Sequence, residues 1–211
     1  NHFLPKKENW EKNLSELGIS NSSNIVIYDN SDLISSCRIW FQFIYFGHNQ
    51  NLVHILNGGL KKWLIENRKV TSKETINIIS KYKANEKKFM IKVKSEIDDN
   101  IKTKKFILLD ARSRERFEGR IPEPRPNVKS GSIKNSFCLP YSECIDPNNN
   151  TFLDKEILKK KFDSCGVNQN NAVFTCGSSV TASVLGVAYS LINSDYMPTI
   201  YIGSWSEYGK K

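Results

Sequence analysis

The chain has 211 residues, of which 39% are hydrophobic and 25% charged, and it carries a formal net charge of +9. This length suits one large domain or two domains of about 100 residues each. Apolar runs all stay below about 18 residues, which excludes a hydrophobic membrane-spanning helix, and the polar, basic start has no signal-peptide character.

The basic balance has two interpretations. It fits a solvated, lysine-rich surface, which we favour, or an attraction for an anionic substrate. The lysines are densest between residues 81 and 105, and no nucleic-acid-binding motif accompanies them. We therefore expect neither a nucleic-acid partner nor a membrane partner.

Cysteine and histidine usage argues against disulfides and metals. The five cysteines include no Cys-x-x-Cys pair, and the three histidines have no metal-ligand spacing. This usage is typical of a reducing compartment. We expect a cytoplasmic protein without metal or cofactor, with a mitochondrial location as the alternative if the native chain carries an N-terminal extension.

Residues 1–80 alternate between helical and strand patterns. In chain order they predict a helix over 5–18 with Trp10, Leu14 and Leu17 on one face, a strand over 24–29, a helix over 34–46, a strand over 52–56, and a turn at 57–59 that opens a further helix. The lysine-rich segment 81–105 reads as a linker and entry to a second domain, with a strand over 88–93 and a helix over 96–104.

Residues 106–211 continue the alternation. They predict strands over 106–110, 131–139 and 172–176, helices over 155–164 and from Val180 onward, and a polar turn at 148–151. Strands that alternate with helices indicate parallel sheets with helices on both faces. The fold class is therefore α/β.

Two stretches of the chain are similar to each other. NIVIYD at 24–29 matches NAVFTC at 171–176, and VHILNGGLKKW at 53–63 matches PTIYIGSWSEY at 198–208. These similarities indicate a tandem repeat of one structural unit. We expect the first copy to be incomplete, because the strands that precede residue 171 have no counterparts before residue 24. We expect it to leave sheet edges uncovered and to be marginally stable.

Cys176 ends the buried strand of the second copy. Gly177, Ser178 and Ser179 follow it and lead into a helix N-terminus, where unpaired N–H groups favour an anion. A thiol in this position is a candidate nucleophile in its thiolate form. The alternative is an inert, buried cysteine. A tyrosine-phosphatase chemistry is disfavoured, because no arginine follows Cys176 to clamp a phosphate.

An arginine-rich segment follows the strand at 106–110. Pro122, Pro124 and Pro126 exclude a continuous helix there, so the segment is expected to form a loop. Carboxyl ends of parallel strands line one crevice, so this loop and the Cys176 loop are expected to meet.

These motifs together resemble a known family. DARSRERFEGRIPEPR, GSIKNSFCLP, FTCGSSVTA and YIGSW are similar to the second domain of two-domain rhodanese-like sulfurtransferases of the 3-mercaptopyruvate type, and VIYDNSD and LNGGLKKW to their inactive first domain. The resemblance implies tandem rhodanese-like domains, the first incomplete: 1–80 inactive, 81–105 linking, and 106–211 catalytic.

The resemblance also implies roles for individual residues. Cys176 would carry sulfur as a persulfide, Ser178 would take part in a proton relay, and Arg116 and Arg125 would bind the donor carboxylate. The substrate-binding loop would consist of Gly177, Ser179, Val180 and Thr181. Arg112, Arg114 and Arg120 are expected to make surface or structural pairs, and Asp110 to bond backbone rather than transfer protons.

The neutral residues after Cys176 favour 3-mercaptopyruvate over thiosulfate, because thiosulfate-preferring relatives carry cations there. The implied partners are a small anionic sulfur donor and, as acceptor, cyanide or a thiol, either thioredoxin-like or of low molecular weight. Two alternatives stay open: a thiosulfate sulfurtransferase, and a non-catalytic sulfur carrier or regulatory module.

Overall fold

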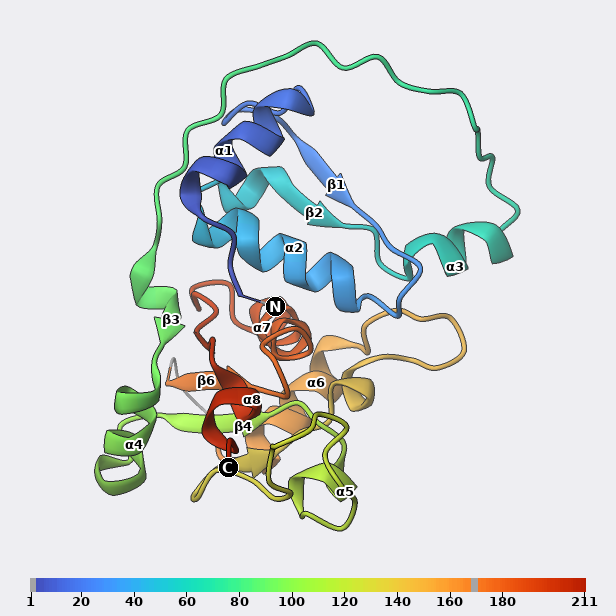
Figure 1. Ribbon diagram of the computed structural model, residues 1–211. Helices are drawn as coiled ribbons and strands as arrows, with labels where there is room; N and C mark the ends of the chain where they lie inside the picture. Colours follow the sequence, from blue (N-terminus) through green and yellow to red (C-terminus); the bar gives the residue numbers. More distant parts are fainter. Residues whose placement is uncertain (1–2, 168–170) are drawn as a thin grey trace.

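The structure is a computed structural model that describes residues 3–167 and 171–211 (Figure 1). Its described strands form two parallel sheets, one of two strands in the order β1-β2 and one of five in the order β3-β7-β6-β4-β5. The α/β class and the parallel pairing predicted from the alternating pattern are confirmed. The smaller sheet belongs to the first of the two similar stretches.

The first part of the chain carries three α-helices around its small sheet. The elements are α1 (Lys7–Glu16), β1 (Ile25–Ile27), α2 (Ile34–Tyr45), a 3-10 turn (Gln50–Leu52), β2 (Val53–Ile55) and α3 (Gly59–Ile65). Helix α2 packs against both strands. The outer side of β1 is uncovered, since Val26 and Tyr28 are each 61% exposed.

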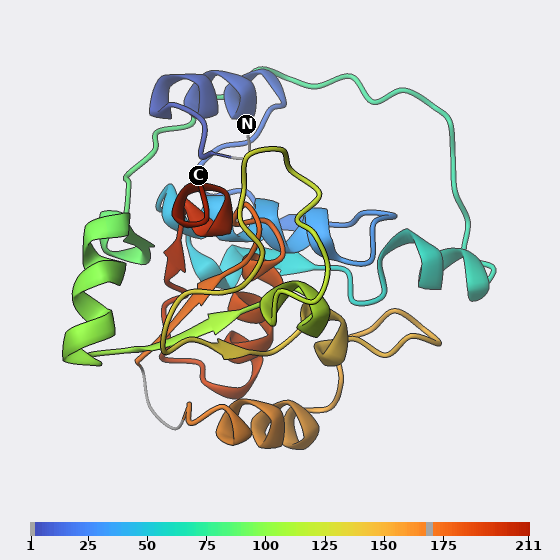
Figure 2. The same cartoon turned by 60° about the horizontal axis from the view of Figure 1, so that its bottom comes forward.

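The second part begins at the edge strand of the larger sheet. Its elements are a 3-10 turn (Lys88–Met90), β3 (Ile91–Lys92), α4 (Lys94–Thr103), β4 (Ile107–Asp110), α5 (Arg114–Phe117), β5 (Phe137–Cys138), a 3-10 turn (Tyr141–Cys144), α6 (Lys155–Ser164), β6 (Ala172–Thr175), α7 (Ala182–Ile192), β7 (Ile200–Tyr201) and α8 (Ser204–Tyr208). An extended segment, drawn as the long outer strap in Figures 1 and 2, joins α3 to this part.

Alternating side chains of the central strands fill two separate cores. Leu109 and Phe174 face the larger core with α6 and α7, whereas Leu108 and Val173 face a smaller core with Trp205 of α8. Helices therefore cover both faces of the five-stranded sheet.

Helix α7 joins the two parts of the molecule. It is apolar on all sides, its residues from Ala182 to Tyr189 are buried, and it packs against both α6 and α2. Figure 1 shows α2 lying beside α7, between the two sheets. The helix that follows Cys176 is thus also the contact with the first part.

Several local expectations were wrong, and of the strand expected over 131–139 only Phe137–Cys138 is a strand. Leu17 is 56% exposed rather than packed with Trp10 and Leu14, because α1 ends at Glu16 and the chain turns at Gly18. The helix expected from Val180 begins at Ala182. The arginine-rich segment contains a four-residue helix, α5, since its first proline lies five residues beyond Phe117.

The linker expected over 81–105 contains β3 and α4, and β3 pairs with β7 of the larger sheet. The division into domains at 1–80 and 106–211 stays a prediction.

None of the helices over 3–167 and 171–211 combines the length and apolar character needed to cross a bilayer.

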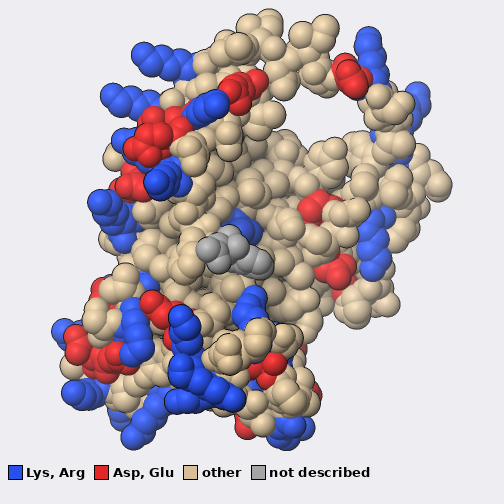
Figure 3. All heavy atoms as spheres, viewed as in Figure 1, with Lys and Arg blue, Asp and Glu red and all other residues tan. Residues whose placement is uncertain are grey.

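Basic side chains are spread over the surface among acidic ones. Figure 3 shows Lys and Arg gathered along one side, over α1 and around α4, with Asp and Glu between them. Several are i,i+4 pairs, among them Lys94 with Asp98 at 2.7 Å. This mixture supports a solvated surface as the main use of the positive charge.

Candidate functional site at the Cys176 loop

Cys176 lies between β6 and α7, as the sequence pattern predicts. Strand β6 ends at Thr175 and α7 begins at Ala182, so residues 176–181 form the connecting loop. We call these six residues the Cys loop. Cys176 itself is 2% exposed.

The start of α8 holds the Cys loop in place from one side. The backbone N–H of Trp205 donates to the carbonyl of Cys176 at 2.9 Å, and that of Ser206 donates to the carbonyl of Gly177 at 3.0 Å. These bonds turn the first two carbonyls of the loop toward α8. The loop is thereby fixed to the second sheet through β7 and α8.

Arg116 and Arg125 converge on the Cys loop. A Cβ atom added to Gly177 would lie 3.0 Å from Nη1 of Arg125 and 3.1 Å from Nη2 of Arg116. Nη2 of Arg125 also donates to Oγ of Ser178 at 2.9 Å. Two guanidinium groups therefore meet at the residue that follows Cys176, where glycine leaves room for them.

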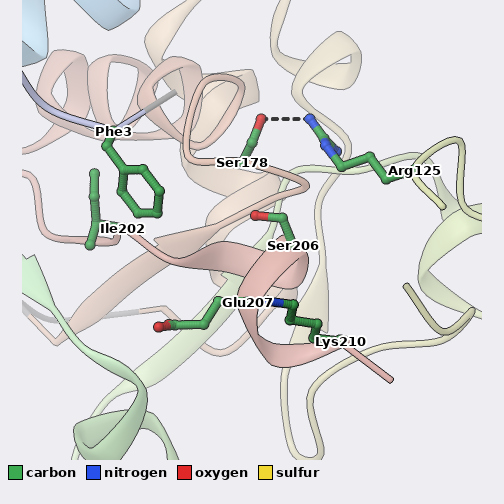
Figure 4. Close-up of a pocket in the computed structure, with 7 residues that line it drawn as sticks. All are labelled: Phe3, Arg125, Ser178, Ile202, Ser206, Glu207 and Lys210. Carbon is green, nitrogen blue, oxygen red and sulfur yellow. Dashed lines mark hydrogen bonds between the residues drawn. The ribbon is translucent and has the colours of Figure 1, made fainter. Parts of the chain in front are cut away.

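A cavity of about 530 Å³ opens beside this meeting point. Arg125 and Ser178 line it together with Ser206, Glu207 and Lys210 of the C-terminal segment, and Phe3 and Ile202 close its apolar end (Figure 4). The arginine-rich loop and the Cys loop thus share one cavity, as expected for two loops at strand carboxyl ends. Its size suits a small organic anion.

Arg116 is held by a buried carboxylate that the sequence patterns did not single out. Glu123 accepts from Nη2 of Arg116 at 2.6 Å and from Nη1 of Arg112 at 2.7 Å, and its side chain is 1% exposed. Burial works to raise the pKa of Glu123, but its hydrogen bonds and Coulombic contacts with both arginines outweigh burial and lower it.

Arg112 continues this chain of alternating charges. It donates to both carboxylate oxygens of Asp110, at 2.7 to 3.1 Å, and its guanidinium lies 4.7 Å from the ring centre of Trp205. Asp110 accepts the backbone N–H of Arg112 at 3.0 Å, as expected, and the guanidinium in addition. Both are buried, so their pairing is structural.

The other two arginines of the segment make the surface pairs expected of them. Arg114 pairs with Glu143 at 2.7 Å, and Arg120 pairs with Glu118 at 2.5 Å, with both arginine side chains about half exposed. Neither lines the cavity beside Ser178.

Ser179 takes the left-handed conformation, with φ of +63°. Its hydroxyl donates to the carbonyl of Ser178 at 2.7 Å, and its own carbonyl accepts from Oγ of Ser183 at 3.2 Å. Local hydrogen bonds offset the strain at Ser179, whereas glycine would adopt this conformation freely.

Val180 and Thr181 complete the loop before α7. The carbonyls of Val180 and Thr181 accept from the backbone N–H groups of Ser183 and Val184, each at 3.0 Å. Thr181 occupies the N-cap position, but its hydroxyl makes no capping hydrogen bond.

Asp29 shows what the equivalent loop of the first copy binds. The repeat aligns Asp29 with Cys176, and the Asp29 carboxylate accepts backbone N–H groups of Ser31, Leu33 and Ser36, the last at 2.6 Å. Burial acts to raise the pKa of Asp29, but hydrogen bonds from Ser36 and Ser31 outweigh it and lower it. In the first copy, the strand–loop–helix unit therefore stabilises an anion, which is the carboxylate of Asp29 itself.

The other four cysteines lie in surroundings that disfavour a thiolate. Burial raises the pKa of Cys138 and of Cys144 to about 12. The pKa values of Cys37 and Cys165 are also raised, chiefly by burial. All five cysteines are free thiols.

No group of three or more His, Cys, Asp or Glu side chains over 3–167 and 171–211 could hold a metal ion. His48 is buried and contacts Tyr82 and the carbonyl of Ser23, while His54 is exposed. His2 lies outside the described residues.

The fold and the site together define a class: an α/β protein of two similar units, the second with a cysteine loop between a strand and a helix N-terminus and two arginines beside it. The family model for the rhodanese-like domain matches residues 1–66 and 93–211. The chain belongs to this family.

Individual relatives support the same family assignment. The chain is 34% identical to the 3-mercaptopyruvate sulfurtransferase of Mus musculus over 212 residues, covering 98% of this chain and 69% of the relative. It is 32% identical to thiosulfate/3-mercaptopyruvate sulfurtransferase 1, mitochondrial, of Arabidopsis thaliana over 98% of this chain, and spans 59% of that relative's length. The crystal structure of the Tum1 protein from Saccharomyces cerevisiae matches 97% of this chain and 72% of its own, with a TM-score of 0.81 and 25% identity.

Proposed function

We propose that the chain is a sulfurtransferase that takes sulfur from 3-mercaptopyruvate and passes it to a thiol or to cyanide through a persulfide on Cys176. The observation that carries this proposal is the convergence of Arg116 and Arg125 on Gly177, directly after Cys176. The names of relatives with about a third of their residues identical support the reaction class.

In the first half-reaction the Cys176 thiolate attacks the sulfur of the donor. The new S–S bond forms as the carbon–sulfur bond breaks, and the bonding electrons move into the pyruvate enolate. A proton then converts the enolate to pyruvate. Arg125 and Arg116 would hold the donor's carboxylate and keto oxygen, for which planar guanidinium forks are suited.

In the second half-reaction the acceptor attacks the outer sulfur. The persulfide S–S bond breaks, the acceptor keeps the outer sulfur, and the Cys176 thiolate is regenerated. The positive end of α7, which begins at Ala182, would favour the anionic sulfur in both steps. Ser178 is a candidate for moving the proton to the enolate, since this residue lines the cavity and its hydroxyl accepts a hydrogen bond from Arg125.

Donor choice follows from the loop. Gly177 and Ser178 are neutral, so the cationic charge of the site comes from Arg116 and Arg125, which fit a monocarboxylate. The proposed location is a reducing compartment such as the cytoplasm, because all five cysteines are free thiols. A thioredoxin-like protein or a small thiol would be the acceptor.

Steady-state turnover with 3-mercaptopyruvate and with thiosulfate, at equal acceptor concentration, tests the proposal. The expected result is pyruvate release with a kcat/KM well above that for thiosulfate. A preference for thiosulfate would reassign the donor. Persulfide formation without turnover by any acceptor would identify a sulfur carrier rather than an enzyme.

A further inference from the structure

A buried arginine of the first part of the chain reaches the Cys loop. Arg38 lies on α2 and is 7% exposed, and its Nη1 donates to the carbonyl of Ser179 at 3.3 Å. Its guanidinium also lies 5.8 Å from the ring centre of Phe41. The contact joins residues 141 positions apart in sequence.

We propose that Arg38 is a positioning residue for the chemistry of Cys176: it fixes the Cys loop through Ser179 and directs a positive charge from the first part of the chain toward the thiolate. The proposal rests on the proposed function for the use of that thiolate as a sulfur carrier. The first part of the chain has Asp29 where the second has Cys176, and this proposal gives it a direct role at the site of Cys176.

The contact falls on the conformationally demanding residue of the loop. Ser179 has φ of +63°, and its carbonyl receives Nη1 of Arg38 and Oγ of Ser183. Ser183 belongs to α7 and Arg38 to α2, which pack against each other. The packing of the two helices therefore sets the orientation of the Ser179 peptide and, with it, the loop that begins at Cys176.

Electrostatics act in the same direction as the geometry. Burial lowers the pKa of Arg38 to about 10, and the Coulombic interaction with Cys176 opposes this lowering. A group with this pKa is still protonated near neutral pH. The charge of Arg38 therefore acts on Cys176 as well as on the carbonyl of Ser179.

Other charged groups surround the same loop from the second part. Arg116 and Arg125 lie beside Gly177, Arg116 is paired with Glu123, and the adjoining cavity is lined by Glu207 and Lys210. None of these groups lies on α2. Removing Arg38 should therefore change the field at Cys176 while the donor-binding arginines stay in place.

The test is the pH dependence of Cys176 alkylation by iodoacetamide in the full chain, with the modified site assigned by fragmentation mass spectrometry. Two neutral variants are compared: Arg38→Gln, which keeps a polar tip, and Arg38→Met, which fills the site with an apolar chain that buried positions tolerate. Arg38→Lys keeps the charge. Arg68→Gln, at an exposed arginine of the first part paired with Glu66, is the matched control.

We expect the midpoint of the alkylation profile to rise by roughly one pH unit in both neutral variants. Arg38→Lys should move it by less than half as much, and Arg68→Gln should leave it at the wild-type value. Thermal unfolding shows which variants are folded. A folded neutral variant with the wild-type profile would overturn the proposal.

Alkylation needs no sulfur donor, so the outcome is separate from that of the proposed function. If the wild type transfers no sulfur from either donor but the neutral variants still shift the profile, the sulfurtransferase assignment fails and the role of Arg38 stands. If sulfur transfer is normal but the profiles of the neutral variants are unshifted, the sulfurtransferase assignment stands and the role of Arg38 fails.

Discussion

Nη2 of Arg125 lies 2.9 Å from Oγ of Ser178, and this hydrogen bond joins the loop after β4 to the loop after β6. The two residues are 53 positions apart and meet because their strands are neighbours in a parallel sheet. Both line the same cavity, which Cys176 itself does not line, so a donor carboxylate entering it would compete with the Ser178 hydroxyl for the same guanidinium. Binding of a donor to Arg125 would therefore change a hydrogen bond of the Cys loop.

Replacing Arg125 with alanine should lower kcat/KM for 3-mercaptopyruvate by roughly 10- to 100-fold, the usual value of a hydrogen-bonded charge. Arg125→Lys should recover only part of the loss, because an ammonium cannot bind a carboxylate with two parallel bonds. Arg120→Ala, at an exposed arginine of the same segment, is the control and should match the wild type. Equal effects of the two alanine variants would remove Arg125 from the donor site.

Ser178→Ala removes the acceptor of the Arg125 hydrogen bond and the hydroxyl proposed for proton transfer. We expect kcat to fall by roughly 100-fold or more, in the range of general acid–base effects. Combining it with Arg125→Ala in a double-mutant cycle should give losses smaller than the product of the single ones, since the residues are in contact. Fully multiplicative losses would show that the two side chains act independently.

Glu123→Gln should destabilise the fold near neutral pH by about 3 kcal/mol, because two arginines lose their shared buried carboxylate. Since the pKa of Glu123 is lowered in the folded protein, its contribution is present above the unfolded value of about 4.3 and is lost as pH falls through the folded value. Urea unfolding of wild type and variant across that range is the measurement. The difference between them should shrink on acidification; a difference independent of pH would contradict the ion-pair interpretation.

Ser179 offers a test of the loop conformation. Ser179→Gly should stabilise the chain by up to about 1 kcal/mol, because glycine adopts a positive φ without steric cost. Ser179→Val should destabilise it by about 2 kcal/mol, since a β-branched residue is disfavoured there. Thermal unfolding of both variants beside Ser190→Ala on α7 gives the comparison. A destabilised glycine variant would mean that the hydroxyl bond to Ser178 outweighs the strain.

Sequence patterns predicted the parts of the fold that depend on local order. The apolar run before Cys176 predicted β6, the helical run after Ser179 predicted α7, and the similarity between 24–29 and 171–176 placed Asp29 opposite Cys176. Strand ends were predicted less well, as β1 covers three residues of the six expected. Short strands in a two-stranded sheet have few partners that fix their limits.

The pairing partners of the site could not be predicted in the same way. Glu123 stands in a proline-rich segment with no periodicity, and its role depends on two arginines folding back onto it. Arg38 is a single arginine on an apolar helix, and from the sequence its side chain would be expected on the surface. Only the packing of α2 against α7 brings it to Ser179. Both depend on tertiary contacts that a local pattern does not carry.

The most direct test of the central claim is the intact mass of the protein after incubation with 3-mercaptopyruvate and removal of the excess donor. The wild type and Cys138→Ser should each gain one sulfur atom that an added thiol removes, whereas Cys176→Ser should gain none. Sulfur retained by Cys176→Ser, or absent from the folded wild type, would contradict the assignment of Cys176 as the sulfur carrier.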